Sequence, residues 1–379
     1  MRVHLDNLDI ICSNHTGFNN YFAWPTVARL QDGRLAMTAS GFRLEHVDPF
    51  GKAIICFSED EGQSWSLPAP VIDTPLDDRD SGVTAFGDNN VIVTSFNNTI
   101  AFQHACAART PETENYKRGY LQALSAMGDV EEKYLGSTFV ISKDGGKSFG
   151  EVQRIPVTAP HGPCPMPDGT ALYVGTKFSL RAEAPEEGQN NLACYRVFPD
   201  GSYEFLSEIE NTYHDHLFCE PHAVVLRSGK VIVHIRVQNV EKNFYTTFQC
   251  ESYDMGRSFT KPHQILPNLA GAPCHLIETS DGTIVSVYQY NGEYAFKHQT
   301  PEGIPQRNEI RVMFSRDGGE TWDYNHVLYG QEGIIDLDMG YPASVELKDG
   351  SILTVFYGMP ESGSPAVIMQ RKWRFEHEV

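Results

Sequence analysis

An eight-residue turn motif, Ser-x-Asp-x-Gly-x-x-(Trp/Phe), occurs four times in the chain. In such a turn the Asp carboxylate accepts backbone N–H bonds, the Gly adopts a positive φ, and the aromatic ring packs beneath the turn. Four separate copies predict an all-β chain built from repeated hairpins. The motif is structural, so we assign no chemistry to its aspartates. The copies are SEDEGQSW from Ser58, SKDGGKSF from Ser142, SYDMGRSF from Ser252 and SRDGGETW from Ser315.

A second repeat is a strand, a tight turn and an alternating strand, roughly Pro-x-x-x-x-Leu-x-Asp-Gly-x-(Ile/Leu)-x-(Val/Leu). Successive copies start 52 to 79 residues apart, an irregular spacing typical of propeller blades with loop insertions. Each Ser-Asp-Gly turn lies downstream of one such hairpin, which places it between the third and fourth strands of a blade. The two repeats together predict a six-bladed β-propeller occupying residues 1–379 as a single domain. The six copies begin at Trp24, Asp80, Ala159, Glu220, Ala272 and Tyr341.

One stretch, Thr113 to Gly136, has apolar residues at near-helical spacing. It falls in the longest interval between hairpins and predicts a small helical insertion in the second blade. Three roles stay open for it: a wall of the active-site mouth, a contact in a homo-oligomer, or plain surface elaboration.

Composition restricts the partners of the chain. The formal net charge is -19, from 30 basic and 49 acidic residues, which disfavours nucleic acid and anionic membranes. No apolar run resembles a signal peptide or a membrane span, so we expect a cytoplasmic protein. The eight cysteines include no Cys-x-x-Cys pair, which excludes a zinc ribbon and argues against a disulfide framework. We expect neither a cofactor nor a metal.

The residues that open the six hairpins are the natural site candidates, because the innermost strands of a propeller converge on its axis. They form a polar, titratable and aromatic set, whereas the later parts of the same hairpins are apolar. This set comprises Ala23, Trp24, Arg79, Asp80, Pro160, His161, Glu220, His222, Pro273, His275 and Tyr341.

At these positions the whole chain resembles the sialidase superfamily, whose propellers carry the same turn motif, the Asp box. The resemblance implies that Tyr341, in GYPASVELKDG, is the nucleophile and that Glu220, in EPHAVVLRSG, takes its proton. It also implies that Arg236 binds the substrate and that Asp48 is the acid/base. A neutral phenol suits an acidic sugar because the substrate's own carboxylate would repel a carboxylate nucleophile.

The arginine clamp of sialidases is incomplete here. The first arginine is replaced within Phe22-Ala23-Trp24-Pro25, and either Arg307 or Arg311 could be the third. Arg43 and Arg79 are substitute cations for binding an anion. With Asp80 and three histidines at similar hairpin positions, His161, His222 and His275, they complete the predicted substrate site. Hydrogen bonding to sugar hydroxyls explains those histidines better than a metal does.

The resemblance therefore implies a retaining exo-glycosidase that cleaves a terminal sialic acid or a related acidic sugar from a glycan. Two alternatives stay open. One is the same fold acting by hydrolysis or elimination on a uronic or neutral sugar, which the missing arginine and the histidines favour. The other is a carbohydrate-binding propeller without catalysis, because a fold does not determine a function.

Overall fold

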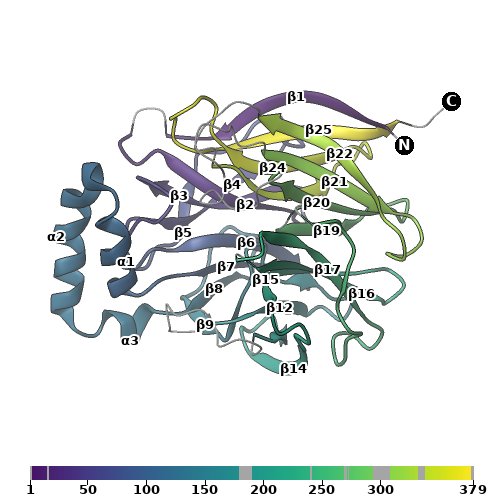
Figure 1. Cartoon of the computed structure of the whole chain (residues 1–379), viewed down its shortest axis with the longest axis horizontal. Helices are drawn as coiled ribbons and strands as arrows, with labels where there is room; N and C mark the ends of the chain where they lie inside the picture. The colour runs from purple at the N-terminus through teal and green to yellow at the C-terminus, as the bar shows by residue number, and fades with distance from the viewer. Residues whose placement is uncertain are drawn as a thin grey trace.

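The computed structural model describes residues 2–14, 17–178, 190–239, 241–268, 271, 273–292, 308–331 and 338–376. They form six antiparallel sheets arranged as a six-bladed β-propeller, which confirms the predicted fold (Figure 1). The inner strands contact one another in a closed ring, in the order β2, β6, β11, β15, β19, β23 and back to β2. A ring of this kind brings the six hairpin entrances together at one axis.

The blades follow one another along the chain. Blade one contains β2 (Tyr21–Arg29), β3 (Leu35–Arg43), β4 (Lys52–Ser58) and β5 (Ala69–Ile72). Blade two contains β6 (Arg79–Phe86), β7 (Asn90–Phe96), β8 (Ser137–Ser142) and β9 (Gln153–Ile155). Blade three contains β10 (Val157–Thr158), β11 (Cys164–Pro165), β12 (Ala171–Lys177), β13 (Leu192–Val197) and β14 (Tyr203–Ile209). Blades four and five contain β15 (Leu217–Val225), β16 (Val231–Asn239), β17 (Phe244–Ser252) and β18 (His263–Gln264); and β19 (Cys274–Glu278), β20 (Ile284–Tyr290), β21 (Asn308–Ser315) and β22 (Asp323–Gln331).

The sixth blade joins the two ends of the chain. Its first three strands from the axis outward are β23 (Gly340–Glu346), β24 (Ile352–Gly358) and β25 (Val367–Glu376). The N-terminal strand β1 (Arg2–Cys12) pairs antiparallel with β25. Figure 1 shows β1 lying along β25. This pairing closes the propeller with backbone hydrogen bonds and leaves β1 as the outer strand of the blade.

The four Asp boxes lie between the third and fourth strands of blades one, two, four and five, as predicted. In the first box Ser58 Oγ donates to Asp60 Oδ1 over 2.9 Å, and the same carboxylate accepts the backbone N–H of Ser64 over 2.8 Å. Trp65 Nε1 donates to Gln370 on β25 of the neighbouring blade over 3.0 Å. In this box the aspartate holds the turn, and the tryptophan docks blade one against blade six.

The predicted helical insertion is present between β7 and β8 of the second blade. It consists of α2 (Pro111–Met127) and α3 (Val130–Tyr134), preceded by α1 (Ile100–Ala107), which the sequence did not predict. Figure 1 shows the helices together on one side of the propeller. Lys117 of α2 pairs with Glu45, so the insertion braces the loop that follows β3.

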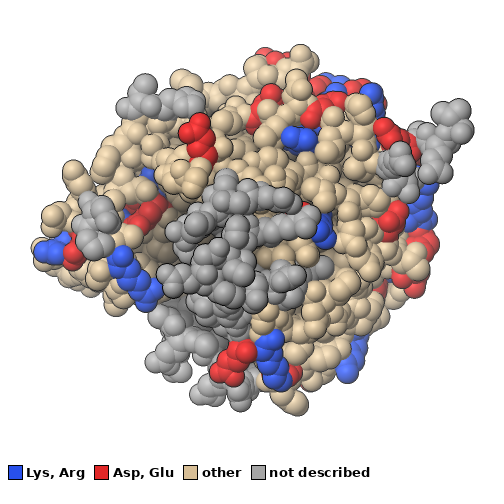
Figure 2. All heavy atoms as spheres, turned by 45° about the horizontal axis from the view of Figure 1, so that its top comes forward, with Lys and Arg blue, Asp and Glu red and all other residues tan. Residues whose placement is uncertain are grey.

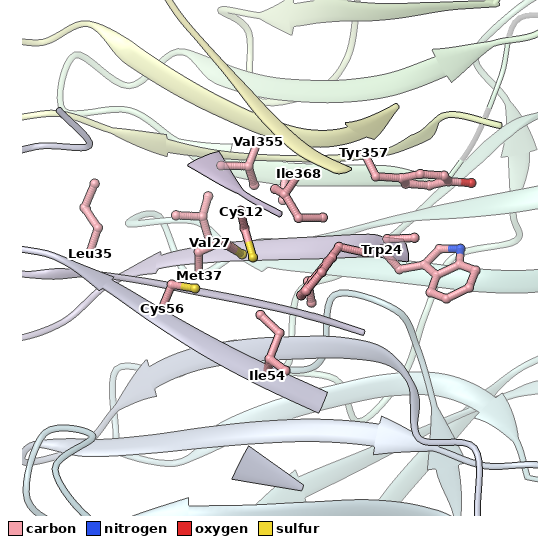
Figure 3. Close-up of a cluster of buried hydrophobic side chains, with 14 of the residues drawn as sticks. Cys12, Trp24, Val27, Leu35, Met37, Ile54, Cys56, Val355, Tyr357 and Ile368 are labelled. Carbon is pink, nitrogen blue, oxygen red and sulfur yellow. The ribbon is translucent and has the colours of Figure 1, made fainter. Parts of the chain in front are cut away.

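Apolar side chains fill the space between neighbouring blades. Figure 3 shows the cluster between blades one and six, in which Val27, Met37 and Ile54 face Val355 and Ile368. Burial of this kind is worth roughly 25 cal/mol for each Å² of apolar surface removed from water. Trp24 and Tyr357 lie at one end of the cluster, where the core meets the hairpin entrances (Figure 3).

On the face drawn in Figure 2, acidic and basic side chains are interspersed, and the described residues form no continuous basic patch there. Among the described residues, no helix is long and apolar enough to cross a membrane.

Candidate active site

One backbone irregularity places the candidate residues. In blades one, two, four and six, two residues of the first strand lie opposite one of the second, which is a β-bulge. The residue within each bulge has a positive φ of 46° to 56° although it is not glycine. Bulges re-aim side chains, and such strained backbone concentrates at functional sites. The four bulge residues are Trp24, Asp80, Glu220 and Tyr341.

Glu220 is the centre of a hydrogen-bonded group at the blade-four entrance. Its Oε1 accepts the Tyr341 hydroxyl over 2.6 Å, and its Oε2 accepts Arg236 Nη1 over 2.5 Å. The Glu220 side chain is 21% exposed, so part of it faces open space. Burial and the carboxylates of Glu220 and Asp80 raise the pKa of the Tyr341 phenol well above its usual value. The phenol is therefore neutral at rest, and its hydroxyl donates to Glu220.

Two further N–H groups of Arg236 also have a partner. Its Nε and Nη2 both donate to Gln238 Oε1, over 3.1 Å and 2.8 Å. The Nε–Nη2 edge of a guanidinium is one of the edges that can bind a carboxylate through two parallel hydrogen bonds. A substrate carboxylate could use it only after displacing Gln238.

Asp80 is the bulge residue of blade two and is only 7% exposed. Its Oδ1 is buried without a hydrogen-bond partner among the described residues. Burial is the main cause that raises the pKa of Asp80 to about 7, opposed by the positive charge of Arg79. An unpartnered buried carboxyl oxygen is costly unless a ligand, a water molecule or a proton satisfies it.

The raised pKa predicts a pH-dependent cost to stability. Between about pH 4 and pH 7 folded Asp80 keeps a proton that the unfolded chain has lost, so stability falls as pH rises through this window. Asp80→Asn removes this dependence. We compare the free energy of unfolding of this variant with that of the unchanged chain by urea denaturation. The difference, variant minus unchanged chain, should therefore be roughly 3 kcal/mol larger at pH 7.5 than at pH 4.5. An equal difference at both pH values would contradict the raised pKa.

Trp24 stands where the sialidase resemblance led us to look for the first arginine, with Ala23 beside it. The guanidinium carbon of Arg79 lies 4.4 Å from the centroid of the Trp24 ring, and that of Arg43 lies 5.1 Å from it. The ring of Tyr341 is 6.4 Å away and nearly perpendicular. The indole therefore contacts both predicted substitute cations and also packs against Tyr341.

Both of these arginines are paired with Asp77. Arg43 Nη1 lies 2.6 Å from Asp77 Oδ1, and neither side chain has any exposed surface. Arg79 Nη1 lies 3.8 Å from the other Asp77 oxygen and donates to the carbonyl of His46 over 3.0 Å. Arg43 is thus a buried structural cation in this structure, and it presents no surface to a substrate.

Asp48, the predicted acid/base, is also completely buried. Its Oδ1 accepts the backbone N–H of Phe50 over 2.9 Å, and its Oδ2 accepts that of Leu44. Burial raises the pKa of Asp48 to about 6. The carboxylate closes its own loop in the manner of a turn-forming aspartate, and the catalytic role stays a prediction.

A second pair at the entrances was not predicted. His46 Nδ1 lies 3.2 Å from Asp338 Oδ2, and the His46 side chain is 51% exposed. Asp338 also accepts the hydroxyls of Tyr21, over 2.5 Å, and Tyr357, over 2.9 Å. The only sequence signal for Asp338 was its place three residues before Tyr341, whereas the contact itself joins blades one and six.

The three predicted histidines do meet at the axis. The rings of His222 and His275 stack with centroids 4.3 Å apart, and His161 lies 5.1 Å from His275. Burial depresses the pKa of all three well below the usual value, so the rings are neutral. His161 lies 6.4 Å from the Tyr341 ring, which places this cluster directly next to the Glu220 group.

The hydrogen bonds of these rings do not suit a metal. His222 Nδ1 accepts the backbone N–H of Leu276 over 3.0 Å, and His275 Nδ1 accepts that of Ser344 over 3.3 Å. Each neutral ring therefore carries its proton on Nε2, whereas a metal-binding Nε2 requires the proton on Nδ1. The described residues contain no group of three or more His, Cys, Asp or Glu arranged around a metal.

Below the histidines a cavity of about 420 Å³ lies between the later parts of the inner strands. Its walls are mainly apolar, for example Val27, Val83 and Leu276, and the three histidines line it too. The cluster therefore separates the bulge residues from this axial cavity.

Of the two candidates for the third arginine of the clamp, the structure describes Arg311. Arg311 donates to Glu309 Oε2 over 2.6 Å and to Asn325 over 2.8 Å, and it lies over the Tyr290 ring. All three of these partners belong to blade five, the blade of Arg311 itself. Arg307 lies outside the described residues.

Comparison with solved structures gives the same fold throughout the chain. A protein of unknown function from Dyadobacter fermentans is 17% identical, with 99% of each chain covered and a TM-score of 0.71. An intramolecular trans-sialidase from Ruminococcus gnavus is 12% identical, with 97% of each chain covered and a TM-score of 0.60. An α-L-arabinofuranosidase from Fusarium graminearum is 12% identical, with 98% of each chain covered and a TM-score of 0.60.

No curated protein matches the chain in sequence. A family model does: residues 125–354 match the model described as the BNR repeat-like domain. This match covers more than half of the chain and includes three of its four Asp boxes. Together with the six blades, it shows that the chain belongs to the BNR repeat-like family.

Proposed function

We propose that the protein is a retaining glycoside hydrolase that acts on an uncharged sugar, with Glu220 as the nucleophile. The observation that carries this is the double hydrogen bonding of Glu220 by Tyr341 and Arg236, at 2.6 Å and 2.5 Å. Two donors, one of them charged, fix the direction of the carboxylate. An ionised, oriented and partly exposed carboxylate is what attack on an anomeric carbon requires.

The charge at the entrances supports an uncharged substrate. Each arginine that the described residues place there has a carboxylate partner: Arg43 and Arg79 have Asp77, and Arg236 has Glu220. Asp48 and Asp338 add further acidic groups. A substrate carboxylate would meet this excess of acidic groups, whereas the positive charge that develops on a sugar ring in the transition state would be stabilised by it.

The second candidate is the sialidase mechanism on an acidic sugar, in which Tyr341 attacks and Glu220 takes its proton. It is favoured by the contact of Tyr341, Glu220 and Arg236, the three residues for which the resemblance implies these roles. The folds of sialidases and of an arabinofuranosidase are both similar to this one, so fold similarity does not separate the candidates.

A panel of aryl glycosides separates them. We expect turnover of at least one uncharged pentoside or hexoside, with kcat/KM at least about tenfold above that for an aryl α-sialoside or β-glucuronide, because an acidic substrate has to displace Gln238 or Glu220 from Arg236. The reverse preference would establish the second candidate. Binding of sugars without turnover, measured by calorimetry, would contradict both and identify a carbohydrate-binding propeller.

A further inference from the structure

The reaction proposed above requires a proton donor for the leaving group, and the structure offers more than one acidic group. We propose that Asp80 is this donor and that it later activates the water molecule. The inference rests on the proposed glycosidase function, and it assigns to Asp80 a role that its predicted place in substrate binding does not include.

Position is the first argument. Asp80 and Glu220 occupy the same bulge position in blades two and four, each with a φ of 46°. The inner strands of these blades belong to one closed ring, so equivalent residues face the same axis. The negative charges of Glu220 and Asp80 both raise the pKa of Tyr341, so both carboxyl groups lie near its hydroxyl. The same β-bulge in two blades therefore directs two carboxyl groups toward the same part of the axis.

The contrast between the two carboxyl groups is the second argument. Glu220 accepts hydrogen bonds on both oxygens, one of them from a guanidinium. Asp80 Oδ1 has no partner among the described residues, and the side chain is more than nine-tenths buried. Where the surroundings of two carboxyl groups favour opposite protonation states, the ionised group can act as the nucleophile and the protonated group as the acid.

The charged groups around Asp80 agree with this division. Burial is the largest influence and opposes the ionised form, as do Glu220 and Asp77, whereas Arg79 and Arg43 favour it; the net effect raises the pKa of Asp80 to about 7. A donor needs a proton near neutral pH and must lose it readily, which this balance provides.

The competing donors are less suited. Asp48 has no exposed surface, and backbone N–H groups occupy both of its oxygens. His46 is half exposed, but its Nδ1 lies 3.2 Å from Asp338 Oδ2 and its ring packs on Trp24 with centroids 4.8 Å apart, so the structure pairs it with Asp338.

The two steps balance. Glu220 forms a bond to the anomeric carbon, the bond to the leaving oxygen breaks, and the Asp80 proton moves to that oxygen. Ionised Asp80 then takes a proton from water, the hydroxide oxygen bonds to the anomeric carbon, and the bond to Glu220 breaks. Both side chains return to their starting states.

The test is the leaving-group dependence of Asp80→Asn, using aryl glycosides of the sugar preferred in the panel. A dinitrophenyl leaving group needs no proton, so we expect its first step to slow less than about tenfold. A phenyl leaving group needs one, and kcat/KM should fall about 10²- to 10⁴-fold. The decline of kcat/KM of the unchanged chain above about pH 7 should disappear in the variant. Azide, which needs no base, should restore turnover of Asp80→Ala.

Asp78→Asn is the matched control. Asp78 is also buried, with a pKa raised to about 7, but its oxygens accept the N–H and hydroxyl of Thr74. Its leaving-group dependence should not change. Equal losses with both leaving groups in Asp80→Asn, or a selective loss in His46→Gln or Asp48→Asn instead, would overturn the proposal. If the unchanged chain hydrolyses none of the glycosides, the proposed function itself is wrong, and the inference fails with it.

Discussion

Replacing Glu220 with glutamine should lower kcat by at least about 10⁴-fold on the preferred glycoside, whereas Tyr341→Phe should lower it only about 10- to 150-fold. Glutamine keeps the size of the side chain but removes the negative charge that attacks the sugar. Phenylalanine removes one of the two hydrogen bonds that orient Glu220 and keeps the ring in place. A hydrogen bond to a charged group is worth about 1.5–3 kcal/mol, which sets the smaller loss.

The ratio of the two losses identifies the nucleophile. Steady-state kinetics on purified variants measures it, and mass spectrometry with a slow, fluorinated substrate shows which residue carries the sugar. A loss for Tyr341→Phe as large as that for Glu220→Gln, with the label on residue 341, would contradict the carboxylate nucleophile and support the sialidase mechanism. Tyr173→Phe is the matched control, because it removes a buried hydroxyl that accepts the N–H of Ala159 in blade three. Its activity should stay within about twofold.

Arg43→Met should lower the free energy of unfolding by about 3–5 kcal/mol. Methionine fills much of the volume but leaves the buried Asp77 without its 2.6 Å partner, and Arg79 then lies 3.8 Å from the other carboxylate oxygen. It also removes the donors that hold Ser40 Oγ at 2.7 Å and the His46 carbonyl at 3.1 Å. Denaturation with urea measures the loss, and the double variant Arg43→Met/Asp77→Leu should recover part of it.

Arg118→Met provides the comparison at the surface. Arg118 pairs with Glu114 one turn away on α2, and its side chain is half exposed, so its loss should change stability by no more than about 0.5 kcal/mol. An Arg43→Met variant that is as stable as the unchanged chain but has a KM raised at least about tenfold would show that Arg43 binds substrate, as the sequence predicted, and does not hold the loop.

The sequence alone determined the fold to the level of the blades. Asp boxes and hairpins are local structures, in which a serine, an aspartate and a glycine within a few residues satisfy one turn. Their repetition can therefore be counted without knowing any long-range contact. The same holds for the helical insertion, although its first helix, Ile100–Ala107, is too short to stand out from its apolar surroundings.

The sequence also pointed to the residues at the blade entrances, because inner strands must converge. It could not determine what each of them does. Burial of Arg43 and Asp48 depends on how the loop after β3 packs against Asp77 and the helical insertion. The pairing of His46 with Asp338 joins positions 292 residues apart.

The tertiary structure also determines the different surroundings of the two carboxyl groups Asp80 and Glu220. Asp80 and Glu220 have the same place in the repeat and the same backbone conformation. Only the tertiary structure gives Glu220 two donors and leaves an oxygen of Asp80 without one. Turn chemistry depends on neighbours in the chain and can be predicted from it. The charge state of a carboxyl group depends on neighbours in space, and here these come from four different blades.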